Sequence, residues 1–146
     1  MLSKKIKFLK YKNRNFSINS KKVKKNDIFF AMEGSKQSGN LYSSEALSKG
    51  AYKVVTSKNT KNKNYLIVKN VNKFLAEACS VKYKEKPKNI IAVTGTNGKS
   101  SVANFYFQIL KNLKINSAAI GTLGIFYKNK VKRTNLTTPD IITIHK

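Results

Sequence analysis

The sequence predicts an α/β protein made of a small mixed α/β domain followed by the start of a second domain built on a parallel sheet. Three observations support this prediction. Short apolar runs alternate with helical periodicities over residues 16–83. A lysine-rich segment ending at Pro87 then separates this region from the rest. After it, a glycine turn joins an apolar run at residues 90–93 to a helical pattern that begins at Ser100.

The first domain is expected to span residues 1–87. Ser43 or Ser44 can cap a short helix that ends at Gly50, because a glycine after the last turn favours the left-handed C-terminal conformation. A longer helix is expected from Asn72, its cap, to about Tyr83. The expected strands cover residues 6–9, 16–19, 27–32, 52–56 and 65–68.

The second domain is expected to span residues 88–146. Its continuous apolar run at 90–93 is typical of a strand buried on both faces, and apolar residues then recur at three- and four-residue steps to about Leu113. A strand at residues 117–125, interrupted by Gly121 and Gly124, and a hairpin around Asn129 should follow. A last helix should start with Thr138 as its cap. These elements cannot cover both faces of a parallel sheet, so we expect this domain to be incomplete.

The turn between strand and helix has the residues of a phosphate-binding loop. Gly95 and Gly98 allow positive φ and close approach of the backbone to an anion, at the N-terminus of a helix. Lys99 can place a cation on the outer phosphates, and Ser100 can offer its hydroxyl to Mg²⁺. The spacing is shorter than Gly-x4-Gly-Lys-Ser/Thr, because Val93 stands where the first glycine would be. The alternative is an ordinary strand-to-helix turn with a solvated lysine.

Composition and charge limit the partners and the cellular location that we expect. The net charge is +24, from 30 Lys and Arg against 6 Asp and Glu, which is typical of polyanion-binding proteins. However, the lysines are spread along the whole chain and only two of the basic residues, Arg14 and Arg133, are arginines, so we expect a solvated surface and no dedicated nucleic-acid face. The single cysteine, Cys79, fits a reducing compartment. With no apolar stretch of about 20 residues, we expect a soluble cytoplasmic protein without a membrane partner.

These motifs resemble the Mur ligases, the ATP-dependent amide-forming enzymes of peptidoglycan precursor synthesis. The loop at residues 94–101 is similar to their shortened ATP loop, and Leu136-Thr-Thr-Pro-Asp140 is similar to a second element of the branch that adds the third amino acid. Residues 19–21, 26–31, 34–39 and 46–51 resemble the UDP-binding domain of the family. The resemblance covers residues 18–140.

The resemblance implies a set of binding residues. ATP would be held by Gly95, Thr96, Asn97, Gly98, Lys99, Ser100 and Ser101, with Lys99 catalytic and Ser100 on Mg²⁺. The uridine nucleotide would be held by Ile18, Ser20, Ser35, Lys36 and Gln37, and the muramoyl-dipeptide by Thr137 and Thr138. Asn19, Lys21 and Ser38 depart from the family's usual Asp, Arg and Asp, so we expect UDP binding to be altered.

The implied reaction joins meso-diaminopimelate or L-lysine to UDP-N-acetylmuramoyl-L-alanyl-D-glutamate through an acyl phosphate. The family's magnesium-binding glutamate, carbamylated lysine and C-terminal domain, which binds the diamino acid, have no counterpart in these 146 residues. We therefore expect an N-terminal part of such an enzyme that is inactive alone. Two alternatives stay open: another Mur-type ligase such as folylpolyglutamate synthetase, and a non-catalytic nucleotide- or RNA-binding protein.

Overall fold

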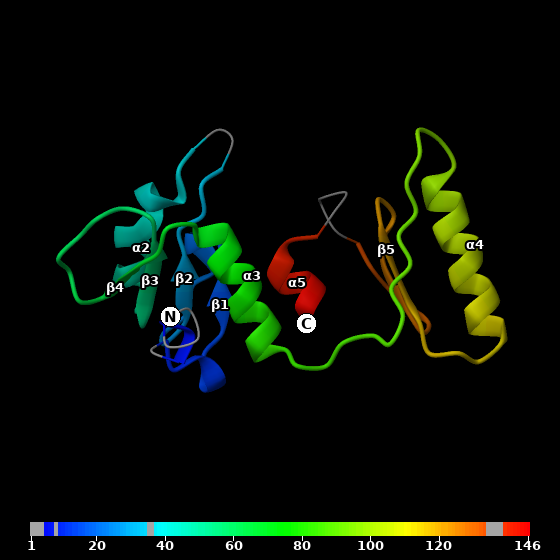
Figure 1. Cartoon of the computed structure of the whole chain (residues 1–146), viewed down its shortest axis with the longest axis horizontal. Coiled ribbons are helices and arrows are strands. Elements are labelled where there is room, and N and C mark those ends of the chain that lie inside the picture. The colour runs from blue at the N-terminus through cyan, green and yellow to red at the C-terminus, as the bar shows by residue number, and fades with distance from the viewer. Residues whose placement is uncertain (1–4, 8, 35–36, 134–138) are drawn as a thin grey trace. The chain divides into compact units, whose positions relative to one another are not determined.

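A computed structural model describes residues 5–7, 9–34, 37–133 and 139–146 of the chain. The chain divides into two compact units, Met1–Lys84 with His145–Lys146, and Glu85–Ile144. Figure 1 shows the elements of each unit, and the units are described separately below. The domain boundary after residue 87 stays a prediction.

The first unit contains a four-stranded sheet in the order β1-β2-β3-β4, and every neighbouring pair is parallel. The α/β class is therefore confirmed, although each strand is shorter than its apolar run. The parallel sheet, which we expected in the second domain, lies in this first unit. The strands are β1 (Phe16–Ser17), β2 (Ile28–Phe30), β3 (Lys53–Thr56) and β4 (Tyr65–Ile67).

The prediction of a strand at residues 6–9 is wrong. Residues 5–7 form a helical turn, and the amide of Leu9 donates to the carbonyl of Ile6 over 3.1 Å. Ile6 and Leu9 are both buried, at 3% and 0% exposure. A spacing of three residues places two side chains on one side of a helical turn but on opposite faces of a strand, so burial of both favours the turn.

The two helices predicted for the first unit are present at the predicted positions. Their N-cap residues, however, are not the predicted ones. The cap of α3 (Val71–Lys82) is Asn70, whose Oδ1 accepts from the amide of Lys73 over 2.8 Å, and not Asn72. Val71 is buried, so the helix must begin there for this side chain to face the core. Gly50 ends α2 (Ser43–Ser48) with φ +87°, as predicted. The described residues of this unit also form three 3₁₀ turns: η1 (Tyr11–Asn13), η2 (Ser20–Lys22) and η3 (Gly39–Tyr42).

The core occupies both faces of the parallel sheet. Phe30 is fully buried. The centroid of its ring lies 5.0 Å from the ring centroid of Phe16 and 6.4 Å from that of Phe74 on α3. The neighbouring Phe29 belongs to a separate cluster with Ala46 of α2. Because successive residues of a strand point to opposite faces, Phe29 and Phe30 fill two different layers. This arrangement explains why β2 is apolar at every position.

The second unit consists of α4 (Lys99–Asn112) and a three-stranded sheet of β5 (Ala118–Gly121), β6 (Gly124–Tyr127) and β7 (Lys130–Lys132). Both strand pairs are antiparallel, so the single strand expected at residues 117–125 is a hairpin instead. Gly124, at φ +118°, allows the chain to reverse there. The hairpin around Asn129 is confirmed, with Tyr127 paired to Lys130.

The buried strand predicted at residues 90–93 is not formed. These residues are in no strand, and Ile90 and Ile91 are 80% and 60% exposed. A parallel strand needs a hydrogen-bonded neighbour and cover on both faces, and no other strand in the described ranges pairs with this run. The described strands of this unit therefore form an antiparallel sheet, in place of the expected parallel one.

The last helix, α5 (Ile141–His145), is capped by Asp140. Its Oδ1 accepts from the amides of Ile142 and Thr143, both over 3.0 Å, and its Oδ2 accepts from the Thr143 hydroxyl over 2.7 Å. Asp140 therefore stabilises the start of this helix. Pro139 precedes this cap and is not the first helical residue, while Thr138, the predicted cap, lies outside the described residues. None of the described helices has the length and apolar character needed to cross a bilayer.

Replacing Asp140 with alanine should lower the free energy of unfolding of its unit by about 1 kcal/mol at pH 7, the usual effect of losing such a cap. Burial raises the pKa of Asp140, but the hydrogen bonds from Thr143 and Ile142 outweigh burial and hold the pKa below its ordinary value. A lowered pKa stabilises the fold above the unfolded-state pKa and stops doing so as pH falls through the folded-state pKa. The gap in thermal midpoint between wild type and Asp140→Ala should therefore shrink as the pH falls below the ordinary aspartate pKa of about 3.9. A gap that does not shrink below that pH would contradict the role of the ionised carboxylate.

Candidate active site

The glycine loop adopts the backbone conformation that its residues predicted. Gly95 has φ +148° and Gly98 has φ +77°, both in the region that favours glycine. Gly98 is the N-cap residue of α4, so the helix starts at Lys99. The space around Gly98 is open, since a Cβ added there would meet no atom within 4 Å. The strain of positive φ, and not crowding, therefore accounts for glycine at this position.

The first turn of α4 presents free donors. No side chain caps the helix, and the first intrahelical bond at this end runs from the amide of Val102 to the carbonyl of Gly98 over 2.9 Å. The amides of residues 99–101 therefore have no partner within the helix, and they carry the positive end of the helix dipole. The open glycine backbone and these amides together suit a polyphosphate, so the residues present fit a nucleotide.

Lys99 folds back over the loop. Its Nζ donates to the carbonyl of Gly95 and, over 2.7 Å, to that of Thr96. The ammonium group is thus held above the loop, beside the free amides of the helix start. Neutral carbonyls are weaker acceptors for a cation than phosphate oxygens are, so a nucleotide can take over these contacts.

The remaining loop residues are accessible. Thr96, Asn97, Ser100 and Ser101 are exposed, and Ser100 also borders a small pocket between α4 and the β5–β6 hairpin. Among the described residues, no group of three or more His, Cys, Asp or Glu could hold a metal ion. A magnesium ion here would depend on the Ser100 hydroxyl, phosphate oxygens and water, which is a common ligand set for Mg²⁺.

The predicted uridine-binding residues of the first unit lie where parallel strands end. Ile18 is half-buried directly after β1, and Ser20 is buried at the start of η2. Gln37 is exposed in the loop that follows β2. Since β1 and β2 are parallel, the structure brings these segments to the same edge of the sheet, where open α/β sheets bind ligands. Ser35, Lys36, Thr137 and Thr138 lie outside the described residues.

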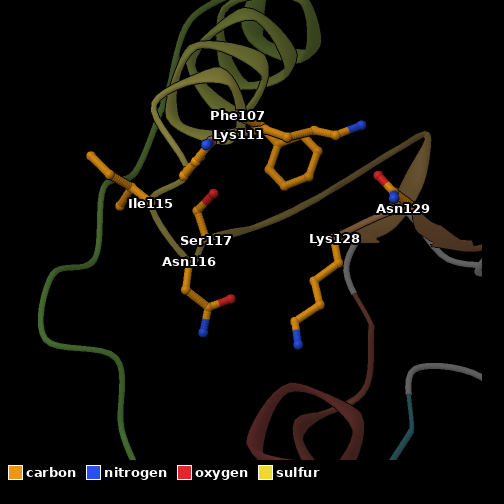
Figure 2. A pocket seen from close by; sticks show the side chains of 8 residues that line it. Phe107, Lys111, Ile115, Asn116, Ser117, Lys128 and Asn129 are labelled. Carbon is orange, nitrogen blue, oxygen red and sulfur yellow. The ribbon is translucent and has the colours of Figure 1, made fainter.

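One described pocket lies away from the glycine loop. Figure 2 shows it beside the C-terminal end of α4, lined by Phe107, Lys111, Ser117 and Lys128 among others. Its volume is about 430 Å³. No residue of the predicted sites contributes to it. Lys111 lies in the last turn of α4, where a cation stabilises the negative end of the helix dipole. The helix dipole therefore accounts for this lysine without a ligand.

Comparison with known proteins identifies the family. The description "Mur ligase family, catalytic domain" matches residues 13–92, more than half of the chain. The chain belongs to the Mur ligase family. The family resemblance that we drew from the loop and from residues 19–51 is therefore confirmed.

Curated relatives in this family share the name UDP-N-acetylmuramoyl-L-alanyl-D-glutamate--2,6-diaminopimelate ligase. The chain is 47% identical over 120 residues to the protein of Rickettsia montanensis and 43% identical over 145 residues to that of Rickettsia conorii. It is 39% identical over 130 residues to that of Rhizobium meliloti. These matches cover 81%, 95% and 87% of the chain but only 25%, 30% and 27% of the relatives. The chain thus spans about a quarter to a third of their length.

Comparison with solved structures also finds Mur ligases. A structure of the ligase with the same name aligns with a TM-score of 0.68 at 25% identity, over 90% of this chain and 28% of the other. A MurF ligase from Thermotoga maritima, in complex with ADP, aligns with a TM-score of 0.58 at 30% identity, over 68% of this chain and 23% of the other. Both are Mur ligases, which supports the α/β class and an adenine nucleotide as a ligand of this family.

Two residues near the predicted uridine site were missed by the sequence analysis. Asn40 and Thr56 hydrogen-bond to each other although they are sixteen positions apart. Asn40 directly follows Gly39, the one nearby signal in the sequence, but nothing in the sequence indicates its partner.

Proposed function

We propose that this chain provides the nucleotide-binding part of a Mur ligase that adds diaminopimelate to UDP-N-acetylmuramoyl-L-alanyl-D-glutamate at the expense of ATP. The observation that carries the proposal is the glycine loop with its uncapped helix start at α4, in a chain that is 43% identical over 145 residues to a diaminopimelate ligase. Nucleotide substrates are also consistent with a cytoplasmic location.

The loop would bind ATP through Gly95, Thr96, Asn97, Gly98, Lys99, Ser100 and Ser101. The free amides at the start of α4 would hold the β- and γ-phosphates, and Lys99 would leave the carbonyls of Gly95 and Thr96 to contact them. The Ser100 hydroxyl would contact Mg²⁺, which neutralises phosphate charge when bound. These residues would position the transferred phosphoryl group and stabilise its charge.

The first unit would hold the uridine nucleotide at the carboxyl edge of its sheet. Ile18 and Ser20 would contribute from the end of β1, and the loop carrying Ser35, Lys36 and Gln37 from the end of β2. We propose that Thr137 and Thr138 hold the muramoyl-dipeptide. Lys21 replaces the family's usual arginine and keeps the positive charge. However, it lacks the planar guanidinium group that can form two hydrogen bonds to one phosphate.

The chemistry would run in two steps. A D-glutamyl carboxylate oxygen would attack the γ-phosphorus of ATP, form an acyl phosphate and break the bond to the β-phosphate, which releases ADP. The amine of the diamino acid would then attack the acyl carbon, form the amide, lose a proton and release inorganic phosphate. Lys99 would stabilise the charge of the transferring group in the first step.

Lys99→Ala tests the loop. We expect about 10- to 100-fold weaker ATP binding in the presence of Mg²⁺, the effect of losing a charged hydrogen-bond donor to phosphate, measured by isothermal titration calorimetry. Lys111→Ala is the matched control, since it removes the same charge from the other end of the same helix. Unchanged affinity in Lys99→Ala, or an equal loss in both variants, would overturn the role of the loop.

A further inference from the structure

Asn40 connects the loop after β2 to the interior of the first unit. Its Nδ2 donates to Glu33 Oε1 over 2.8 Å and to Ser38 Oγ over 3.0 Å. Its Oδ1 accepts from the hydroxyl of Thr56. Both ends of one half-buried amide are therefore used, with partners on two different segments of the chain.

Thr56 provides a rigid anchor for this network. It is the last residue of β3 and only 1% exposed. Its Oγ1 also accepts from the amide of Lys58 over 2.9 Å, so the hydroxyl proton is left for the bond to Asn40. The hydroxyl is thereby fixed in one orientation, and Asn40 is held against the end of a core strand.

The other partners of Asn40 close the base of the loop. Glu33 and Ser38 form an isolated antiparallel bridge, and the amide of Gly34 donates to the carbonyl of Gln37 over 3.1 Å. Asn40 contacts both bridge residues through side-chain atoms. It therefore holds the two ends of the loop together and ties them to β3.

The loop is located where a ligand would be bound. It follows the carboxyl end of β2, and Thr56 marks the carboxyl end of the parallel neighbour β3. Gln37 lies in this loop, and its Oε1 accepts from the hydroxyl of Tyr42. Both Nδ2 protons of Asn40 and one lone pair of its Oδ1 are already used to hold the loop, so we expect its effect on binding to be indirect.

We infer that Asn40, anchored by Thr56, is a positioning residue that holds Gln37 and the two ends of its loop, Glu33 and Ser38, in the arrangement that binds the uridine nucleotide. The inference rests on the proposed function. It assigns Asn40 no contact with the nucleotide. It predicts that affinity for UDP depends on a hydrogen bond between the side chains of residues 33 and 40. Either of the two side chains can supply the donor.

A pair of isosteric changes tests this dependence in the 146-residue chain. Asn40→Asp replaces the donor to Glu33 with a second carboxylate, so two acceptors face each other. Glu33→Gln alone keeps an acceptor for Asn40 and is the matched control. When both changes are combined, the new amide at position 33 can donate to the new carboxylate at position 40, which restores the bond with its direction reversed.

The readout is affinity for UDP by isothermal titration calorimetry, with circular dichroism to verify folding and ADP as the reference ligand. We expect about tenfold weaker UDP binding for Asn40→Asp, near wild-type affinity for Glu33→Gln and for the double variant, and unchanged ADP binding. Equal UDP affinity in Asn40→Asp and wild type would overturn the inference alone. So would a double variant as weak as Asn40→Asp, since it would indicate direct contact or a damaged fold. No UDP binding by wild type would overturn the proposed uridine site and the inference with it.

Discussion

Phe30→Ala should lower the free energy of unfolding of the first unit by about 3–5 kcal/mol, the largest stability effect we expect from a single truncation in this chain. Phe30 is 0% exposed, and its ring lies close to those of Phe16 on β1 and Phe74 on α3. Its removal loses the transfer free energy of the ring and both ring contacts. It also leaves a cavity between a strand and a helix, which can collapse only in part.

Urea denaturation followed by far-ultraviolet circular dichroism measures this loss. Phe105→Ala is the matched control, because it deletes the same ring from a helix position that is 65% exposed, and alanine favours a helix. We expect little change or slight stabilisation in the control. A Phe30→Ala loss below about 1 kcal/mol would mean that this ring is not packed as described. Since small domains have stabilities of about 5–15 kcal/mol, the variant should be only marginally folded.

The reason that this core could be predicted is that it depends on local pattern. Val54 and Phe30 lie in short apolar runs, and Phe74 and Ala78 follow a helical step, so the alternation of strands and helices is visible in the residues themselves. Burial on both faces of a parallel sheet produces the continuous apolar strands. The start of α4 was predictable for the same reason, since Gly98 and Lys99 are neighbours in sequence.

Elements that depend on a partner could not be predicted from local pattern. The run at residues 90–93 has the composition of a buried strand, but a strand forms only where a neighbouring strand bonds to it. The choice of Asn70 over Asn72 as a cap depends on which face of α3 is buried, and so on the sheet beneath Val71. The expected strand at 117–125 has two glycines, and only the pairing of Ile120 with Ile125 distinguishes a hairpin from an interrupted strand.

Some residues of the candidate site could likewise be predicted from local pattern, and others could not. The glycine loop is contiguous, so its position and its backbone conformation could be predicted from the sequence. The network around Asn40 joins residues 33, 38, 40 and 56, and no sequence spacing indicates that an asparagine on η3 bonds to a threonine at the end of β3. Contacts between distant segments require the topology of the parallel sheet.

Gly39→Ala should displace the loop that follows β2 and lower the free energy of unfolding by about 1–3 kcal/mol, the usual range for overpacking. A Cβ at this position would lie 2.5 Å from the carbonyl oxygen of Met32, 2.7 Å from its amide nitrogen and 2.8 Å from the carbonyl carbon of Ala31. All three atoms belong to the backbone, so no side chain can move aside. The hydrogen bond from the amide of Gly39 to the carbonyl of Met32, 2.7 Å long, must break or stretch.

Gly121→Ala is the matched control, because a Cβ there meets no atom within 4 Å and the residue lies in a strand. Hydrogen exchange of residues 31–40 should increase in Gly39→Ala and stay unchanged in Gly121→Ala. Because the carbonyl of Met32 is also where the chain leaves β2 for the Glu33–Ser38 bridge, displacement at Gly39 should separate Asn40 from its partners. UDP binding should then fall at least as far as in Asn40→Asp. Since this clash is in the backbone, Glu33→Gln cannot restore that binding, whereas it should restore it in Asn40→Asp.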